Sequence, residues 1–320
     1  MPGFDMRALD CDMLGPRLGY PALVEALRAG HRAGVDLVER TLLTEPRPGA
    51  PNHLLVWPAW RFGGHLGAKL VSVFPGNGES GGAPTNATVY VLFDGRDGRP
   101  LACLTGDAFT TMKTAADSAL AARYLARPEA EVLAVLGAGA QAPAQVAGLV
   151  AVRPGLRRVL VWNRTGARAL ALAASLRAQG LDAEAVTEAG AAVAQADIVT
   201  AVTGATEPIV EGTRLRPGTH VDLVGGFTPA MREADDETVR RGRLFVDTRR
   251  FTVGACGDLA RPIADGVIGE GDIAGDLFEL CRGEVPGRRD DREITVFKNG
   301  GGGHLDLMTA VAFWEAAGQP

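Results

Sequence analysis

The sequence predicts an α/β fold with two domains, one built on a parallel sheet covered by helices and one of α+β type. In the middle of the chain, short apolar runs alternate with segments of helical period, which is typical of a parallel sheet with helices on both faces. In the first 110 residues, apolar runs follow one another across glycine-rich turns, which favours an antiparallel or mixed sheet. A length of 320 residues suits two domains of ordinary size.

The middle of the chain supplies the strands of the parallel sheet. The expected strands are EVLAVL (131–136), RRVLVWN (157–163), AEAV (183–186), DIVTAV (197–202), HVDLVG (220–225) and RLFVD (243–247). Helical patterns lie between them at 141–152, 165–180, 188–196 and 232–241. Strands and helices therefore alternate as a doubly covered parallel sheet requires.

The two ends of the chain predict the second domain. Expected strands lie at 53–60, 68–74, 87–94 and 100–106, and a helical pattern occurs only before residue 33. The segment TAADSALAARYLA (114–126) predicts a helix that opens with a capping box from Thr114 to Asp117. At the C-terminus, a strand at 293–298 and a glycine loop at 300–303 lead into a helix at 304–317.

Composition and charge argue against several classes of function. Hydrophobic residues make up 46% and charged residues 22% of the chain, which is a globular balance. A net charge of −5 argues against a nucleic-acid partner. No apolar run has the length of a membrane span, and the N-terminus lacks the apolar core of a signal peptide. The 4 cysteines form no CxxC pair, so we expect no metal site and a cytoplasmic protein.

Lysine is rare in this chain. Only three of the 33 lysines and arginines are lysines, namely Lys69, Lys113 and Lys298. Against such an arginine bias, a retained lysine can mark a site that needs a compact, titratable ammonium group. The alternative is that all three are surface lysines without a special role.

The segment VLGAGAQA is the part of the sequence that most strongly predicts a bound ligand. Gly137, Gly139 and Ala142 fill the three small positions of a GxGxxG/A motif, directly after an expected strand and before an expected helix. Such a turn places a pyrophosphate at the helix N-terminus, so Ala140 and Gln141 are expected to contact a dinucleotide as well. The alternative is a glycine-rich turn that binds nothing. The context favours a Rossmann dinucleotide-binding domain.

The residues after the second strand indicate the type of dinucleotide. A domain that prefers NAD usually carries an acid there, but this chain has Asn163, Arg164 and Thr165. Arg164 can pair with a 2′-phosphate, and its neighbours can donate hydrogen bonds to it. We therefore expect NADPH or NADP+ rather than NADH. The alternative is a plain surface arginine.

Two lysines lie at unusual positions. Lys113 precedes the expected helix at 114–126, where a carboxylate would meet both a cation and a helix dipole. Lys69 lies inside the apolar strand AKLVSVF, which is costly unless it faces a polar cleft. The alternative for Lys69 is a lysine that reaches solvent from an edge strand.

Several blocks together resemble a known family. TTMKTAADSALAARYLA, EVLAVLGAGAQA, VLVWNRT, ADIVTAVTGATEPIV, PGTHVDLVGGFTPAMREADDE and ITVFKN are similar, in order and spacing, to the ornithine cyclodeaminase/mu-crystallin family, in its ketimine reductase-like branch. The resemblance runs from about Arg40 to the C-terminus. It implies a dimerising substrate domain of residues 1–126 with 299–320, completed by the C-terminal helix. A Rossmann domain of residues 127–298 would be inserted in it, and the protein would be a homodimer.

The resemblance also assigns residues to the substrate. Arg40, Lys69 and Lys113 match basic residues around a substrate carboxylate, although the family usually has arginine at the third position. Phe227 is also expected to contact the substrate, at a position where cyclodeaminases carry a catalytic aspartate. Phenylalanine cannot relay a proton, so cyclodeamination of ornithine is disfavoured.

Further matches concern the cofactor. The resemblance implies that Thr203, Gly225 and Asn299 contact the dinucleotide, and that His304 lies near the nicotinamide. His304 is either a proton donor or a surface histidine at the start of a helix.

Together these features predict an enzyme that reduces an imine next to a carboxylate with NADPH and yields an amino acid. Lys69 and His304 are the candidate catalytic residues. An iminium substrate is already electrophilic, so the chemistry needs little acid catalysis. Alternatives are an amino-acid dehydrogenase, an ornithine cyclodeaminase in which another residue replaces the acid, and a non-catalytic NADPH-binding protein.

Overall fold

The computed structural model describes residues 6–47, 49–80 and 83–318, which divide into two compact units. Unit 1 comprises Met1–Lys113 and Gly302–Pro320, and unit 2 comprises Thr114–Gly301. The boundaries differ from those expected after residues 126 and 298, because the chain leaves unit 1 inside a continuous helix rather than after it.

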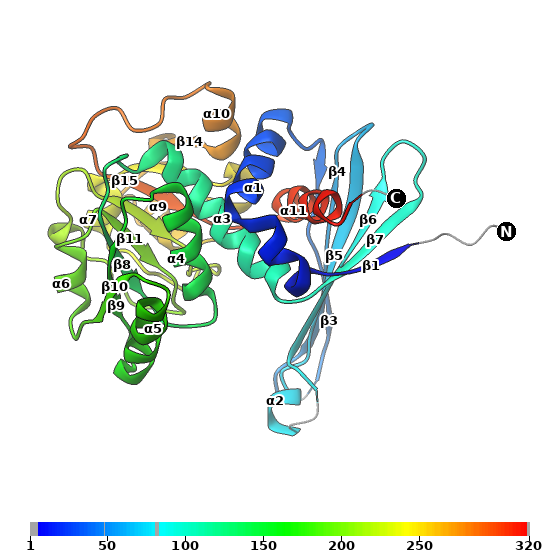
Figure 1. Cartoon of the computed structure of the whole chain (residues 1–320), viewed down its shortest axis with the longest axis horizontal. Helices are drawn as coiled ribbons and strands as arrows, with labels where there is room; N and C mark the ends of the chain where they lie inside the picture. The colour runs from blue at the N-terminus through cyan, green and yellow to red at the C-terminus, as the bar shows by residue number, and fades with distance from the viewer. Residues whose placement is uncertain (1–5, 48, 81–82, 319–320) are drawn as a thin grey trace. The chain divides into compact units, whose positions relative to one another are not determined.

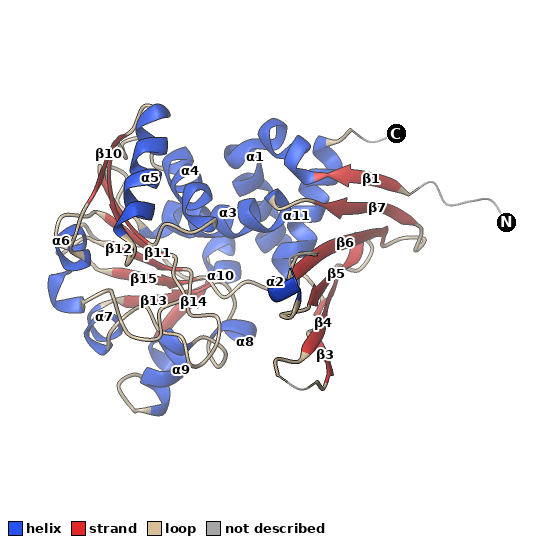
Figure 2. Cartoon of the chain, turned by 90° about the horizontal axis from the view of Figure 1, so that it is seen from below, coloured by secondary structure: helices blue, strands red, loops and turns tan. Residues whose placement is uncertain are grey.

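Unit 1 is built on a mixed sheet in the order β1-β7-β6-β5-β4-β2, with β3 paired to β4. Its strands are β1 (Arg7–Asp10), β2 (Leu37–Val38), β3 (Thr41–Glu45), β4 (Asn52–Trp60), β5 (His65–Val73), β6 (Asn86–Asp94) and β7 (Pro100–Thr105). Its helices are α1 (Cys11–Ala33), α2 (Asn77–Ser80) and α11 (Gly303–Ala316). The four expected strands are confirmed as β4, β5, β6 and β7, whereas β1, β2 and β3 were not expected. Figure 2 shows the strands of this sheet side by side, in the order β1, β7, β6, β5, β4.

The C-terminal helix α11 completes unit 1, as expected. It packs on α1 and on strands β4, β5 and β6, so that residues far apart in sequence meet on one face of the sheet (Figure 1). Most of its residues are buried, including the charged Asp306 and the polar His304 and Thr309. A helix buried around most of its circumference carries ionisable groups only where they find partners.

The helix α3 (Ala108–Leu125) corrects one expectation. It begins six residues before Thr114, so Thr114 lies in its interior and forms no capping box. The start is fixed instead by the Asp12 carboxylate, which accepts the backbone N–H of Ala108 at 2.8 Å and that of Asp107 at 3.3 Å. Lys113 therefore lies in the second turn of a helix and not at its start.

Unit 2 is an eight-stranded parallel sheet in the order β10-β9-β8-β11-β12-β15-β13-β14, which confirms the expected α/β fold. Its strands are β8 (Val132–Leu136), β9 (Arg158–Trp162), β10 (Asp182–Ala185), β11 (Ile198–Ala201), β12 (His220–Leu223), β13 (Arg243–Val246), β14 (Ile273–Asp276) and β15 (Thr295–Lys298). Its helices are α4 (Gln141–Val152), α5 (Gly166–Ala178), α6 (Ala189–Val193), α7 (Asp236–Arg241), α8 (Arg249–Thr252), α9 (Gly257–Ala264) and α10 (Leu277–Arg282).

Alternate residues of the central strands feed two cores, one on each face of this sheet. Leu133 and Val135 belong to a core with residues of α4 and α5, whereas Ala134 and Leu136 belong to one with residues of α6, α7 and α9. Burial of each valine or leucine contributes about 1.5–3 kcal/mol, which explains why these strands are almost entirely apolar.

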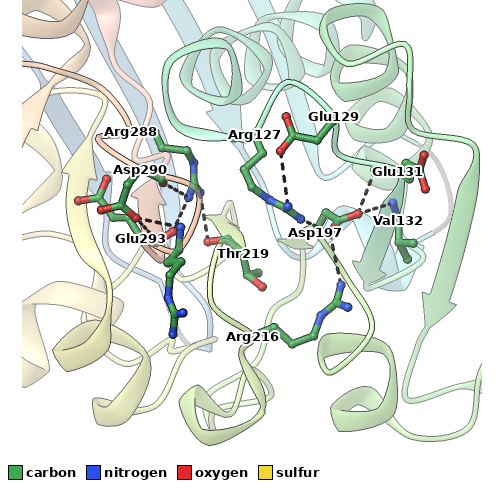
Figure 3. A network of polar contacts seen from close by, with 12 residues as sticks. Arg127, Glu129, Glu131, Val132, Asp197, Arg216, Thr219, Arg288, Asp290 and Glu293 are labelled. Carbon is green, nitrogen blue, oxygen red and sulfur yellow. Dashed lines mark hydrogen bonds and ion pairs between the residues drawn. The ribbon is translucent and has the colours of Figure 1, made fainter.

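The amino ends and the carboxyl ends of the unit 2 strands have different surroundings. At the amino ends of the strands, Asp197 accepts the backbone N–H of Val132 at 3.0 Å and pairs with Arg127 at 2.6 Å and with Arg216 at 3.3 Å (Figure 3). At the carboxyl ends, the chain reverses direction across the sheet between β8 and β11. Ligands of such sheets bind at that reversal point.

Candidate active site

The turn after β8 has the geometry of a dinucleotide cradle. Gly137 has φ +115°, and a Cβ there would lie 2.6 Å from the Val202 carbonyl oxygen, so only glycine fits. A Cβ built on Gly139 would meet nothing within 4 Å, so open space lies beside this backbone, directly before the N-terminus of α4. These residues fit a pyrophosphate, since backbone N–H groups and the positive end of the helix dipole converge there.

A cavity of about 470 Å³ lies at this turn. It is lined by residues after β8, β9 and β11, which are the strands at the reversal point. Six of the residues expected to bind the cofactor line it: Gly137, Gly139, Asn163, Arg164, Thr165 and Thr203. Arg168 and Glu207 also line it and were not expected.

The three residues after β9 have different surroundings. Arg164 and Thr165 are exposed at the cavity. Asn163 instead accepts the backbone N–H of Ala138 at 3.1 Å and donates to the Thr165 carbonyl at 2.9 Å. Its side chain therefore holds the glycine-rich turn against the end of β9, whereas the Arg164 side chain is exposed at the cavity.

The other expected cofactor residues do not line this cavity. Ala142 is fully buried where α4 packs on the sheet, and Gln141 donates to Gln145 at 3.2 Å. Asn299 is 5% exposed, and its amide donates to the Thr114 carbonyl and to the Ser118 hydroxyl, both at 3.0 Å. Ala140 and Gly225 are likewise absent from the lining, so a role for these residues in cofactor binding stays a prediction.

In unit 1, two of the three lysines meet one carboxylate. Lys69 Nζ lies 2.9 Å from Asp306 Oδ2, and Lys113 Nζ lies 2.7 Å from Asp306 Oδ1. All three side chains are buried. Lys69 lies on β5 between β4 and β6, so the alternative of a lysine on an edge strand is wrong.

A third cation joins them through an aromatic ring. Trp57 on β4 is paired with Lys69 on β5, and Lys69 Nζ lies 4.0 Å from the centroid of its ring. The guanidinium carbon of Arg40 lies 4.7 Å from the same ring. We call Arg40, Lys69, Lys113 and Asp306 the Asp306 cluster. Its two lysines share one carboxylate and its arginine lies on the same ring as Lys69, and a cluster of net positive charge attracts a small carboxylate.

The environment of this cluster changes the pKa of two of its members. Burial lowers the pKa of Lys69 to about 8, with Asp306 opposing and Lys113 reinforcing the shift. Burial alone would raise the pKa of Asp306, but Lys113 and Lys69 hold it below its usual value. Asp306 is therefore ionised at neutral pH, whereas Lys69 titrates just above it.

His304 is buried in the same unit, which excludes the alternative of a surface histidine. Its ring meets that of His31 edge-on with centroids 5.8 Å apart. Burial, with a contribution from His31, lowers the pKa of His304 well below its usual range. At neutral pH it is an uncharged imidazole, and its role as a proton donor stays a prediction.

All three lysines, which are notable for their rarity in this chain, are buried. Lys69, Lys113 and Lys298 are 5%, 4% and 0% exposed, so the alternative of three surface lysines is wrong. Sequence reasoning missed the acid that holds two of them. The available clue was an aspartate inside the apolar helix segment HLDLMTAVAF, where a charge without a partner would be costly.

Phe227 lies on the loop after β12 and is 66% exposed. The segment Gly225-Gly226-Phe227 carries no acid, so this chain has a phenylalanine where the family resemblance places the cyclodeaminase aspartate. Within residues 6–47, 49–80 and 83–318, no group of three or more metal-ligating side chains occurs. No helix in those ranges has the length and apolarity needed to cross a membrane.

A Rossmann unit with an open glycine-rich turn, together with a unit that gathers cations, defines a nicotinamide-dinucleotide oxidoreductase for small substrates. The chain belongs to the ornithine cyclodeaminase/mu-crystallin family, whose model matches residues 21–318. It is an enzyme of this family that acts on carbon–nitrogen bonds.

Known proteins support this assignment. The chain is 44% identical over 294 residues to a Delta(1)-pyrroline-2-carboxylate reductase of Paracoccus denitrificans, covering 92% of each. The solved Delta(1)-pyrroline-2-carboxylate reductase of Thermococcus litoralis, in complex with NADH and L-proline, has a TM-score of 0.87 and 31% identity, over 98% of this chain and 97% of that one. An archaeal alanine dehydrogenase dimer with bound NAD has a TM-score of 0.87 and 26% identity, over 98% and 96%.

Proposed function

We propose that this enzyme reduces a cyclic imine that carries a carboxylate on the imine carbon, with NADPH as the reductant, and so produces a cyclic amino acid. The observation that carries the proposal is the Asp306 cluster. Lys69 and Lys113 share one carboxylate and Arg40 lies on the same Trp57 ring as Lys69, so the cluster carries a net positive charge that a substrate carboxylate would reduce. The relatives named for reduction of pyrroline-2-carboxylate support a five-membered ring.

The residues of unit 1 would hold and orient the substrate. Lys69 and Lys113 are fixed by Asp306, so their ammonium groups keep a set position instead of sampling rotamers. Both Lys69 and Arg40 also lie over the Trp57 ring, which restrains their positions. The carboxylate would bind these cations, which fixes the position of the adjacent imine carbon.

The chemistry transfers one hydride and uses one proton. When bound, the dinucleotide supplies the hydride to the imine carbon, and the substrate enters as an iminium that already carries the proton on nitrogen. Where the substrate arrives as the neutral imine instead, Lys69, with a pKa of about 8, can donate the proton to its nitrogen and regain one from solvent between turnovers. No general acid at position 227 is needed, which agrees with the phenylalanine found there.

We propose NADPH rather than NADH because Arg164 is exposed at the cavity, where the 2′-phosphate would lie, and no acid follows β9 in the segment 163–165. The solved relatives named above hold NADH or NAD, which lack the 2′-phosphate. The proposed preference for NADPH therefore rests on this chain's own residues after β9.

We also propose a homodimer formed through unit 1. Large apolar side chains are exposed on its strands and the adjoining turn, among them Leu42, Leu43, Leu54, Trp60 and Phe62. An exposed apolar surface of this kind usually marks an interface. Sedimentation at micromolar concentration should give twice the mass of one chain, and a clean monomer would contradict the proposal. A cytoplasmic location stays a prediction.

The function is tested by following NADPH oxidation with pyrroline-2-carboxylate, piperideine-2-carboxylate, and pyruvate with methylamine. We expect rapid turnover of at least one cyclic imine and slower turnover of the acyclic one. Oxidative deamination of an amino acid with NADP+, without reduction of any of these imines, would instead support the amino-acid dehydrogenase alternative. The likeness to an alanine dehydrogenase makes that alternative worth measuring.

A further inference from the structure

The third lysine lies in a separate buried cluster in unit 2. Lys298 ends β15 and is fully buried. Its ammonium lies 3.0 Å from Asp258 Oδ2 and donates a hydrogen bond to the Gly225 carbonyl oxygen. The other carboxylate oxygen of Asp258 accepts the backbone N–H of Glu233 at 2.7 Å. We call Lys298, Asp258 and Glu233 the Lys298 cluster.

Glu233 connects this cluster to the wall of the dinucleotide cavity. Its Oε1 accepts the backbone N–H of Thr203 at 2.7 Å and the Thr203 hydroxyl at 2.8 Å. Thr203 lines the 470 Å³ cavity. Among the described residues, Glu233 Oε2 has no hydrogen-bond partner, although the side chain is fully buried. A buried carboxylate oxygen without a hydrogen-bond partner lowers the free energy of unfolding, so its retention indicates a functional role for the charge.

The loop after β12 lies directly on the two carboxylates. A Cβ on Gly225 would lie 2.5 Å from Glu233 Oε1, and one on Gly226 would lie 2.4 Å from Asp258 Oδ2. Gly226 also has φ +62°, which favours glycine. The two glycines therefore let the loop approach the acids closely, so Glu233 supports both this loop and Thr203.

The position in the sheet determines which half of a dinucleotide would lie near the cluster. The adenosine half of a dinucleotide binds on the side of the first two strands, here β8 and β9, and the nicotinamide half binds on the other side of the reversal point. Thr203 follows β11, Gly225 follows β12 and Lys298 ends β15, all on that other side. The Lys298 cluster thus supports the nicotinamide half.

The charge of the cluster depends on Glu233. With Glu233 ionised, one cation faces two anions, and with Glu233 protonated the cluster is neutral. Burial raises the pKa of Glu233 to about 7, with Lys298 opposing and Asp258 reinforcing the shift. Cys256 is the other titratable group that acts on Lys298, whose pKa is raised by Asp258 and Glu233 in spite of burial. An oxidised nicotinamide ring is cationic and a reduced ring is neutral.

We propose that Glu233 is a positioning residue that also sets the preference between oxidised and reduced dinucleotide, because its ionised carboxylate favours the cationic ring. This inference rests on the proposed use of a nicotinamide dinucleotide. It makes the ratio of the two affinities depend on pH, because the affinity for the oxidised form rises as Glu233 loses its proton.

The test is direct binding of NADP+ and NADPH, measured by calorimetry without substrate at pH 5.5 and pH 7.5. We expect the ratio of the NADP+ Kd to the NADPH Kd to fall about threefold between these values, the order of magnitude of one charge–charge interaction in a partly hydrated site. Groups that contact only the phosphates titrate equally in both complexes and cancel in the ratio. Glu233→Gln keeps an acceptor for Thr203 and should make the ratio independent of pH.

Glu237→Gln is the matched control, since Glu237 is a half-buried acid on the neighbouring helix α7 that pairs with Arg240, and it should leave the wild-type pH dependence unchanged. If Glu233→Gln fails to fold, Thr203→Val removes one hydrogen bond to the carboxylate and should move the transition to higher pH. A ratio that does not change with pH in the wild type, or that still changes in Glu233→Gln, overturns the inference. Failure of both dinucleotides to bind would overturn the proposed function itself.

Discussion

The two units bury lysines in clusters of opposite charge balance. In the Asp306 cluster of unit 1, Lys69 and Lys113 share one carboxylate, and Arg40 adds a third cation across the Trp57 ring. In the Lys298 cluster of unit 2, one ammonium group is set against two carboxylates.

The difference shows what each cluster can bind. A buried cluster with surplus cations is incomplete until an anion arrives, so it is suited to a substrate carboxylate. A buried cluster with surplus anions repels carboxylates and phosphates, and it favours a cation such as an oxidised nicotinamide ring. We therefore propose that the same rare residue serves two opposite purposes, which are set by the number of acids packed against it.

Removal of the acid should affect the two clusters unequally. Asp306→Asn leaves two buried ammonium groups with no anion, so we expect a loss of about 3–5 kcal/mol in the free energy of unfolding. Asp258→Asn leaves Lys298 with Glu233, so the loss should be smaller, about 1–3 kcal/mol. Urea denaturation of both variants measures this.

A second substitution sharpens that result. Lys69→Met in the Asp306→Asn background removes one of the two repelling cations and should recover part of the lost stability. Equal losses in the two single variants, or no recovery in the double variant, would mean that charge balance does not stabilise these clusters.

Arg164 is an exposed cation at the dinucleotide cavity, so its substitution should change only the affinity for the cofactor. Arg164→Ala should weaken NADPH binding by about 1.5–3 kcal/mol, because it removes a charge-assisted pair with the 2′-phosphate, and should leave NADH binding nearly unchanged. Fluorescence titration with both reduced dinucleotides measures this, with Arg177→Ala on α5 as the control. Equal affinity of the wild type for NADPH and NADH would contradict the assignment.

The pKa of Lys69 predicts a smaller effect of pH on substrate binding. A protonated Lys69 binds the carboxylate, so affinity for a carboxylate ligand should fall as pH rises through about 8. Pyrrole-2-carboxylate is a suitable competitive ligand, since it does not titrate in this range. Lys69→Arg keeps its charge, so its inhibition constant should stay flat up to pH 9.5. A flat profile in the wild type would show that Lys69 does not titrate there.

Much of this molecule could be predicted from local patterns. The limits of the helix α4 and the glycine turn before it follow from apolar period and residue size, which act over a few residues. The sequence marks Lys69 because a charge in an apolar strand is costly, and it marks Lys113 because lysine is rare and because this lysine comes just before an expected helix.

What could not be predicted depends on distant partners. Asp306 lies 237 residues from Lys69, and no local pattern pairs them. The start of α3 is likewise set by Asp12, 95 residues before Asp107. The Lys298 cluster joins the loop after β12, the helix α9 and the end of β15, which lie far apart in the sequence.

The central claim is that the cations of unit 1 bind the substrate carboxylate, and one measurement tests it directly. The kcat/KM values of the wild type and of Lys69→Ala are compared for pyrroline-2-carboxylate and for 1-pyrroline, which lacks the carboxylate. We expect the wild type to prefer pyrroline-2-carboxylate strongly, and Lys69→Ala to lose about 2–4 kcal/mol of transition-state binding with that substrate alone. Loss of equal size with both substrates, or no loss with either, would contradict the account.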